Sequence, residues 1–351
     1  VQHYAWGSLN DGLVAKLSNN RDDKPCAELW MGTHPSGPSI DHESGKLLEE
    51  VIGRKLPFLF KVLSVKKALS IQAHPDKQLA KQLHARDPKN YPDPNHKPEM
   101  TIAVTPFEAL SSFRMKREID ALWEKYPELT LIANPTDSLR EMFGQVMRAD
   151  RETATRVAES ILTKYGDIED PLITLFKRLW IEYPFDVGCF CVFLLNYVCL
   201  NPGEAIFLAA NEPHAYLSGD CIECMAASDN VVRAGLTPKY RDLDTLLKML
   251  TYREFKKEDL LVKPFHQKGG KAEYAVPVDE FAVLRGESDS LDCVVVEKDA
   301  LIIFIDGEGS LHTQQGEKYG YAPGSVYYFY PGSTVTIEPN VSSTWFMAYQ
   351  P

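Results

Sequence analysis

The chain has 351 residues, more than a single hydrophobic core usually holds, so we expect two or three modules. It is 44% hydrophobic and 25% charged, which is typical of a folded globular protein and excludes an intrinsically disordered chain. The formal net charge of -11 argues against nucleic acid or an anionic membrane surface as a partner, because both attract basic proteins. An anionic small-molecule substrate would therefore need a local basic pocket.

The sequence favours a cytoplasmic protein. No secretory signal is visible at its start. The longest apolar run, residues 188 to 200, is too short to span a bilayer and contains Asn196. Seven cysteines, an odd number, fit a reducing compartment. Cys221 and Cys224 form a CxxC pair, but the sequence holds no second CxxC, so we assign this pair no zinc or redox role.

The first 107 residues mix strands with a short helix. Strands are predicted at Pro57–Leu63 and Leu69–His74, and a helix at Asp76–His84, between glycine and proline turns. From about Glu108 to Tyr183 the apolar residues recur at helical spacing, which predicts about four successive amphipathic helices.

Strand patterns return after Pro184, so helices interrupt a strand-rich region. The predicted strands there are Phe193–Leu200, Glu204–Ala210, Ala215–Leu217, Ile222–Ala226 and Val231–Gly235. Helices are predicted at Leu243–Met249 and Glu254–Leu260. From Lys263 onward, short strands between glycine and proline turns are typical of a jelly-roll barrel. These later strands include Cys293–Glu297, Ala300–Ile305, Val326–Tyr330 and Thr334–Ile337.

Polar residues collect in four short motifs. On the strand Leu69–His74, side chains alternate, so Ser70, Gln72 and His74 share one face. A proline-stiffened loop, Tyr91-Pro-Asp-Pro-Asn-His-Lys-Pro-Glu-Met100, can hold several polar side chains in fixed positions. The third motif is Asn211-Glu-Pro-His-Ala-Tyr216, and the fourth, Ser228 to Tyr240, carries Arg233 and Lys239 in an otherwise acidic protein.

The ordered set of motifs resembles the type I mannose-6-phosphate isomerase family. The resemblance rests on QAHPD, NHKPEM, NEPHAY and SDNVVRAGLTPK, together with YAWG at residues 4–7 and AELWMG at residues 27–32. It implies a mainly β fold with two cupin or jelly-roll barrels and an inserted helical domain. We therefore expect a catalytic cupin domain from residues 1–107 and 184–262, a helical insert from 108–183, and a C-terminal jelly roll without metal from 263–351.

The resemblance also implies one zinc ion per chain and an essential arginine. The implied zinc ligands are Gln72, His74, Glu99 and His214, and the arginine is Arg233. Imidazole and carboxylate are usual zinc ligands, and a single anionic ligand leaves the site with a net positive charge that can stabilise an anion. The reaction implied is the interconversion of mannose 6-phosphate and fructose 6-phosphate through an enediol, in carbohydrate metabolism that leads to GDP-mannose.

The residue that transfers the proton is left open by the sequence. Glu223, Lys97 and His96 are all plausible bases, with Asp229 as a possible partner. Arg233 would neutralise charge on substrate oxygens or grip the phosphate. Ser70 and Lys239 are candidates for the phosphate, while His96 and Asp229 are also candidates for substrate binding. Trp6, Trp30 and Tyr216 could line the sugar cleft or pack in the core.

Two other functions remain open at this stage. One is an iron-dependent cupin oxygenase, although a glutamine ligand and the Arg233 and Lys239 pair suit a phosphorylated sugar better. The other is a non-catalytic double cupin, which describes the expected C-terminal barrel, because only His266 and His312 follow residue 214. The expected partner is a small sugar phosphate, and we expect a monomer.

Overall fold

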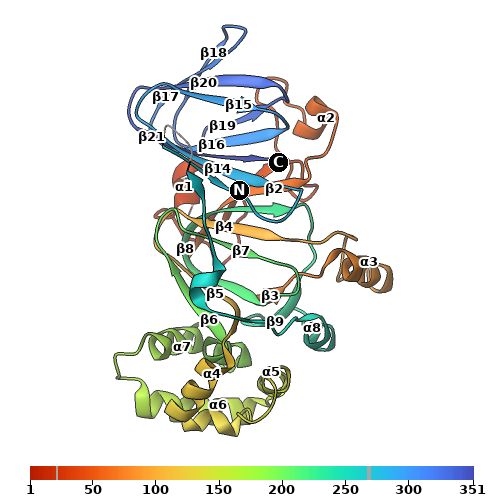
Figure 1. Cartoon of the computed structure of the whole chain (residues 1–351), viewed down its shortest axis with the longest axis vertical. Helices are drawn as coiled ribbons and strands as arrows, with labels where there is room; N and C mark the ends of the chain where they lie inside the picture. The colour runs from red at the N-terminus through yellow and green to blue at the C-terminus, as the bar shows by residue number, and fades with distance from the viewer. Residues whose placement is uncertain (21–22, 267–269) are drawn as a thin grey trace.

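The computed structural model describes residues 1–20, 23–266 and 270–351, which form three parts stacked along one long axis. A first β module occupies the middle, a helical module lies at one end, and a second β module lies at the other (Figure 1). The expected fold class, mainly β with a helical insert, is confirmed. No helix within the described ranges is long and apolar enough to cross a membrane.

The first β module is built around a long central strand, β8. Its strands are β1 Glu28–Gly32, β2 Phe58–Val65, β3 Ile71–Ala73, β4 Glu99–Ala103, β5 Phe107–Arg114, β6 Leu195–Leu200, β7 Ala205–Leu208, β8 His214–Ala226, β9 Val232–Gly235, β10 Glu254–Phe255 and β11 Leu261–Val262. Its helices are α1 Leu13–Leu17, α2 Leu48–Ile52, α3 Lys77–Arg86, α8 Leu243–Met249 and the 3-10 helix η3 Lys257–Leu260. On one side the strand order is β1-β2-β8-β4-β7-β11, and on the other β8 pairs with β3 and β5.

Strand β8 passes from one of these two sheets to the other at Gly219. Its first half pairs with β3 and β5, and its second half pairs with β2 and β4. Gly219 has φ 107°, and a Cβ there would lie 2.4 Å from the carbonyl oxygen of Pro106, so only glycine fits the bend. The prediction of two separate strands in this region is wrong, because the glycine bends the strand without ending it.

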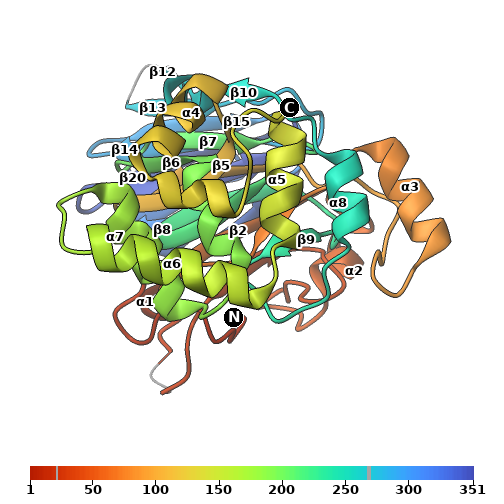
Figure 2. The ribbon, with the colours of Figure 1, turned by 90° about the horizontal axis from the view of Figure 1, so that it is seen from below.

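The helical module is inserted between β5 and β6. It comprises α4 Lys116–Lys125, η1 Pro127–Leu131, α5 Leu139–Arg148, α6 Arg151–Tyr165, α7 Pro171–Glu182 and the 3-10 helix η2 Val187–Phe193. Seen from below, these helices lie across one end of the first β module (Figure 2). Aspartate or serine begins three of the helices, since Ser138, Asp150 and Asp170 each accept a hydrogen bond from a backbone N–H of the first turn.

Two helical assignments from the sequence are wrong at their edges. Residues 108 to 114 are not helical but belong to β5, which pairs with β6 and β8 and is buried on both faces, so it lacks a clear strand alternation. The predicted helix Glu254–Leu260 is a two-residue strand, β10, followed by η3. Residues 254 and 255 are extended because they pair in parallel with the end of β5.

The second β module is a pair of facing sheets. Its strands are β12 Phe265–His266, β13 Lys271–Tyr274, β14 Ala282–Ser288, β15 Asp292–Val296, β16 Ala300–Asp306, β17 Gly309–Thr313, β18 Lys318–Tyr321, β19 Val326–Phe329, β20 Ser333–Pro339 and β21 Ser343–Tyr349. One sheet has the order β12-β13-β14-β21-β16-β19 and the other β15-β20-β17-β18. Apolar side chains such as Ile302, Ile337 and Trp345 fill the space between them.

The first β module is covered on both of its outer faces. Alternate residues of β2, β4 and β8, such as Phe60, Met100 and Ile222, share a core with Val283 and Phe346 of the second β module. At the other face, alternate residues of β3, β8 and β9 pack against the helical module. Because side chains alternate along a strand, the remaining residues of these strands point into the first module.

Candidate metal centre and cleft

Strand alternation assembles a polar interior in the first β module. Glu99 directly precedes Met100, whose side chain belongs to the core shared with the second module, and Lys61 and Glu223 sit directly opposite each other on β2 and β8. On the other sheet, Gln72 of β3 is paired with His214 of β8 and with Arg233 of β9. Residues opposite each other in an antiparallel pair point to the same side, so these polar side chains converge.

Three of the four predicted metal ligands form a buried cluster. His74, Glu99 and His214 offer ligand atoms that all lie within 4.8 Å of one another. The Glu99 Oε2 atom is 3.3 Å from the Nε2 atom of each histidine. All three atoms are buried, and none has a hydrogen-bond partner within the described part of the chain. Buried polar atoms without partners are unfavourable, so their convergence on one point fits a cation between them.

Backbone carbonyls orient both histidine rings. The Nδ1 atom of His74 donates to the carbonyl oxygen of Asn230 at 2.7 Å, and that of His214 donates to the carbonyl oxygen of Glu212 at 3.1 Å. A carbonyl oxygen only accepts, so each Nδ1 carries the proton and each Nε2 keeps a free lone pair. Burial lowers the pKa of His74 to about 4, which keeps this ring neutral at neutral pH.

Glu99 is held as a carboxylate. Burial alone would raise its pKa, but the positive charge of Lys97 holds the pKa of Glu99 well below its usual range. The Nζ atom of Lys97 is 3.0 Å from the Oε1 atom of Glu99, so the other carboxylate oxygen is the one that faces the histidines. Two neutral imidazoles and a carboxylate are a donor set that suits zinc.

Gln72, the fourth predicted ligand, lies at the border between this cluster and an open cleft. Its backbone register with His214 directs both side chains to the same face, and its Oε1 atom accepts a hydrogen bond from Ser70 at 3.5 Å. Gln72 also lines a cleft of ≈ 600 Å³. Ligands from residues 72 to 99 and from residue 214 are thus brought together across the helical insert.

The cleft beside the cluster is rich in cations. Five basic side chains line it, against two carboxylates, Glu28 and Asp229. The basic residues are Lys61, Lys67, Lys97, Arg233 and Lys239. This is the local basic pocket that an acidic protein needs to bind an anion. Trp6 and Trp30 also line the cleft, whereas Tyr216 is buried beneath it, where its hydroxyl bonds Thr101 and Glu223.

The structure places most of the predicted substrate and catalytic residues in this cleft, but not all of them. Ser70, Lys97, Asp229, Arg233 and Lys239 line it.

Two predicted residues do not line the cleft. His96 turns away, and its Nε2 atom lies 2.6 Å from the Oε1 atom of Glu280, in the segment before β14. Glu223 is buried, with its Oε2 atom 2.9 Å from Lys61 Nζ and its Oε1 atom accepting from Tyr216 at 2.8 Å. Burial raises the pKa of Glu223. Both of its oxygens therefore have partners inside the protein.

Lys61 is one of the cleft residues that sequence reasoning missed. Its Nζ atom lies 2.9 Å from Glu223 and 3.5 Å from Glu28, and 5.1 Å from the centre of the Trp30 ring. Burial would lower the pKa of Lys61, but the carboxylates of Glu223 and Glu28 raise it, so it stays charged. The sequence held a signal for Lys61, which is the one charged residue in the apolar run FLFKVLSV. A lysine inside a buried strand needs an acidic partner, so its presence there predicts a buried ion pair.

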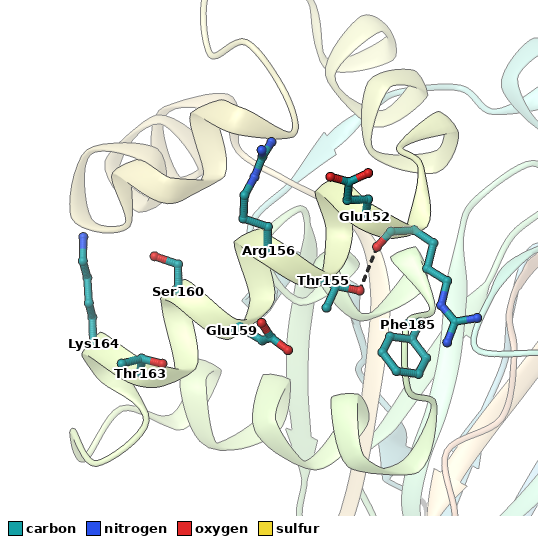
Figure 3. Close-up of a pocket in the computed structure, with 9 residues that line it drawn as sticks. Glu152, Thr155, Arg156, Glu159, Ser160, Thr163, Lys164 and Phe185 are labelled. Carbon is teal, nitrogen blue, oxygen red and sulfur yellow. Dashed lines mark hydrogen bonds between the residues drawn. The ribbon is translucent and has the colours of Figure 1, made fainter.

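A larger hollow lies along α6, at the end of the molecule away from the second β module. It measures ≈ 860 Å³, and Figure 3 shows that its polar side chains project from one face of a single helix. Their partners lie within the helical module: Thr155 donates to the Arg151 carbonyl at 2.7 Å, and Lys164 pairs with Glu128. This hollow lacks the convergent buried ligands of the cluster at His74, and we do not consider it the functional site.

Comparisons with protein families identify two segments of the chain. Residues 1–116 match the family described as phosphomannose isomerase type I, catalytic domain, and residues 117–195 match phosphomannose isomerase type I, helical insertion domain. The boundary between the two matches falls just after β5.

Whole-chain relatives agree with these matches. Mannose-6-phosphate isomerase from Saccharomyces cerevisiae is 40% identical over 402 residues, covering 96% of this chain and 94% of that protein. The Ogataea parapolymorpha enzyme of the same name is 38% identical over 404 residues, covering 98% and 95%.

Solved structures extend the likeness to the whole fold. A mutant phosphomannose isomerase from Salmonella typhimurium superposes with a TM-score of 0.91 at 30% identity, covering 100% of this chain and 97% of the other. A mannose 6-phosphate isomerase bound with zinc and yttrium superposes with a TM-score of 0.84 at 29% identity and the same coverage.

Proposed function

Because the chain belongs to the type I phosphomannose isomerase family and is therefore an isomerase, we propose that it interconverts mannose 6-phosphate and fructose 6-phosphate with one zinc ion. The observation that carries this proposal is the pairing of two features. A buried cluster of His74, Glu99 and His214 has three ligand atoms without hydrogen-bond partners among the described residues, and a cleft lined by five cations opens beside it. A phosphorylated sugar needs both features, one for its reacting oxygens and one for its charge.

Zinc would be held by Gln72, His74, Glu99 and His214, and when bound it supplies positive charge beside the oxygens on which negative charge develops. The donor set fits, because the Nε2 lone pairs and the Glu99 Oε2 atom converge and have no other partner within the described residues. Gln72 contributes a neutral oxygen at the border with the cleft.

Lys97 is the proposed base for the proton that moves between C2 and C1. Among the three candidates from the sequence, Lys97 lines the cleft, whereas His96 contacts Glu280 and both oxygens of Glu223 have partners. Its Nζ atom first releases to solvent the proton that it carries in its pair with Glu99, and as a neutral amine it then takes the C2 proton of the open-chain aldose and returns it to C1. The hydroxyl proton on C2 is lost and O1 gains one, so the aldehyde becomes a ketone with no change in composition.

Arg233 and the outer lysines are proposed to bind the substrate anion. Arg233 is paired in register with Gln72, which places it beside the proposed ligand set, and its guanidinium presents a fixed fork of donors. Lys67 and Lys239 line the cleft as well, and Lys67 lies 4.3 Å from the centre of the Tyr183 ring. We assign these two lysines to the phosphate. Lys67 was not a candidate from the sequence.

The test is an isomerase assay that compares mannose 6-phosphate with free mannose. We expect turnover of the phosphorylated sugar only, and a raised KM for mannose 6-phosphate in Lys67→Met. Lys66→Met is the matched control, because Lys66 is the exposed neighbour of Lys67, faces Asp11 and does not line the cleft. A wild-type protein that does not isomerise mannose 6-phosphate would refute the proposal.

The setting of the reaction follows from the same features. All seven cysteines of the chain are free thiols, which fits a reducing compartment, and we propose the cytoplasm. We also propose that the protein works as a monomer on a small sugar phosphate without nucleic acid or membrane partners, because the proposed site draws all its residues from one chain.

A further inference from the structure

The carboxylate of Asp93 lies at the centre of a dense hydrogen-bond network beside the proposed zinc site. Asp93 belongs to the proline-rich loop that precedes β4. Its Oδ1 atom accepts from Ser228 Oγ at 2.8 Å, from the Asn95 N–H at 2.9 Å and from Asn230 Nδ2 at 3.2 Å. Its Oδ2 atom accepts from the Asp229 N–H at 2.8 Å. One side chain thus ties two loops that are 135 residues apart in sequence.

The turn that Asp93 holds is the one that orients His74. Asn230 is fully buried, and its Nδ2 atom also donates to the carbonyl oxygens of Asp93 at 2.6 Å and of Asn95 at 2.8 Å. The carbonyl of the same Asn230 accepts from His74 Nδ1 at 2.7 Å. Fixing Asn230 therefore fixes the acceptor that decides how the His74 ring is turned and which nitrogen carries its proton.

We propose that Asp93 is a positioning residue that holds the turn Ser228–Asn230 and, through the Asn230 carbonyl, keeps His74 Nε2 directed at the proposed zinc site. This inference rests on the proposed function. Asp93 does not line the cleft, so it acts through other residues and touches neither the substrate nor the ligand atoms. It also fixes the backbone of Asp229, whose side chain does line the cleft.

The chemistry of the network explains why a carboxylate stands at this position. The four groups of the described residues that bond the Asp93 carboxylate are all donors, and a carboxylate is purely an acceptor with two oxygens to offer. An asparagine of the same shape would place an NH₂ group against at least one of these donors, so one hydrogen bond would be lost and one donor left facing another. Three of the donors bond Oδ1 and only the Asp229 N–H bonds Oδ2. The NH₂ group of an asparagine is therefore expected at the Oδ2 position, where it would face the Asp229 N–H.

The experiment measures zinc affinity by competition with a chromogenic chelator in the full-length protein. We expect Asp93→Asn to weaken zinc binding by roughly 10- to 100-fold, the range seen when a residue that orients a metal-bound histidine is lost. Asp87→Asn is the matched control, because Asp87 precedes the same loop and its side chain accepts from Asn90, outside the Asp93 network. Its zinc affinity should stay within about twofold of wild type.

Ser228→Ala keeps the test valid if Asp93→Asn fails to fold. It removes the hydroxyl that donates to Asp93 and accepts from the Asn230 N–H, but it keeps the Asp93 carboxylate with its bonds to Asn95, Asp229 and the Asn230 side chain. We therefore expect a smaller loss of zinc affinity in the same direction. Melting curves of the zinc-free proteins accompany each measurement. If both variants melt earlier but bind zinc as tightly as wild type, the network is structural and the inference is overturned.

The outcomes also separate this inference from the proposed function. A wild-type protein that binds no zinc and does not isomerise mannose 6-phosphate refutes the proposed function, and the inference fails with it. A wild-type protein that binds zinc and is active, beside Asp93 and Ser228 variants with unchanged zinc affinity, overturns the inference alone.

Discussion

The two β modules show how similar sheets can serve different purposes. Inside the first module, strand alternation presents Lys61, Glu99, Glu223 and the two clustered histidines. Inside the second, the corresponding space is filled by apolar side chains such as Ile302 and Trp345. A site for chemistry thus takes the place of a hydrophobic core, and its charges remain buried because they are paired with one another.

The second module compensates for this loss of apolar packing. Its β14, β16 and β21 strands share a core with the outer faces of β2, β4 and β8, the strands that carry the polar interior. The first module therefore gains apolar burial on the outside of its sheet rather than on the inside. The difference between the modules is that substitutions in the second should change stability, while those in the first should also change chemistry.

Removal of zinc should separate the modules most sharply. We expect chelation to abolish isomerase activity and added zinc to restore it, because His74, Glu99 and His214 lie in the first module. Elemental analysis should find about one zinc per chain, since two imidazoles and a carboxylate gather only there among the described residues. An active preparation without metal, or two zinc ions per chain, would break the comparison.

Lys61→Met should destabilise the first module strongly. It leaves the carboxylates of Glu28 and Glu223 buried without their cation, and breaking a buried ion pair in this way costs about 3–5 kcal/mol of unfolding free energy. The double variant Lys61→Met, Glu223→Gln should recover part of that loss. Urea unfolding measures both, and a single variant as stable as wild type would show that the network contributes little.

Arg233→Lys should reduce turnover by about 10²- to 10³-fold while leaving zinc content and melting temperature close to wild type. Lysine keeps the charge but not the planar fork of donors that grips two oxygens at once. Steady-state kinetics with mannose 6-phosphate provides the measurement. Near-normal turnover would remove Arg233 from the mechanism, and loss of zinc would give it a structural role.

Ile302→Val tests the second module with the smallest change. Ile302 is fully buried between the two sheets, so losing one methylene should lower the free energy of unfolding by about 0.5–1.5 kcal/mol. The values of kcat and KM should not change, because no residue of β16 lines the cleft. A clear drop in kcat at full zinc occupancy would show that the core of this module supports the site.

Much of the site could be predicted because its residues lie in compact motifs. The strand Leu69–His74 placed Gln72 and His74 on one face, and Gln72 is indeed paired with His214. The side-chain direction of His96 could not be predicted in this way, since its partner Glu280 comes from a distant part of the chain. Lys61 was missed because a fully buried strand has no alternation to mark its inner face.

The position of β8 between β2 and β4 also bears on how the protein folds as it is made. Strands β2 and β4 are synthesised before the helical insert, but the strand that joins them begins only at His214. Until then both strands present unpaired backbone edges, which are the usual starting points of aggregation. Closure of this sheet must wait for contacts that span more than 110 residues, as in the pairing of Glu99 with Met225. We expect docking of β8 to be a late and slow folding step, at which the nascent chain depends most on chaperones.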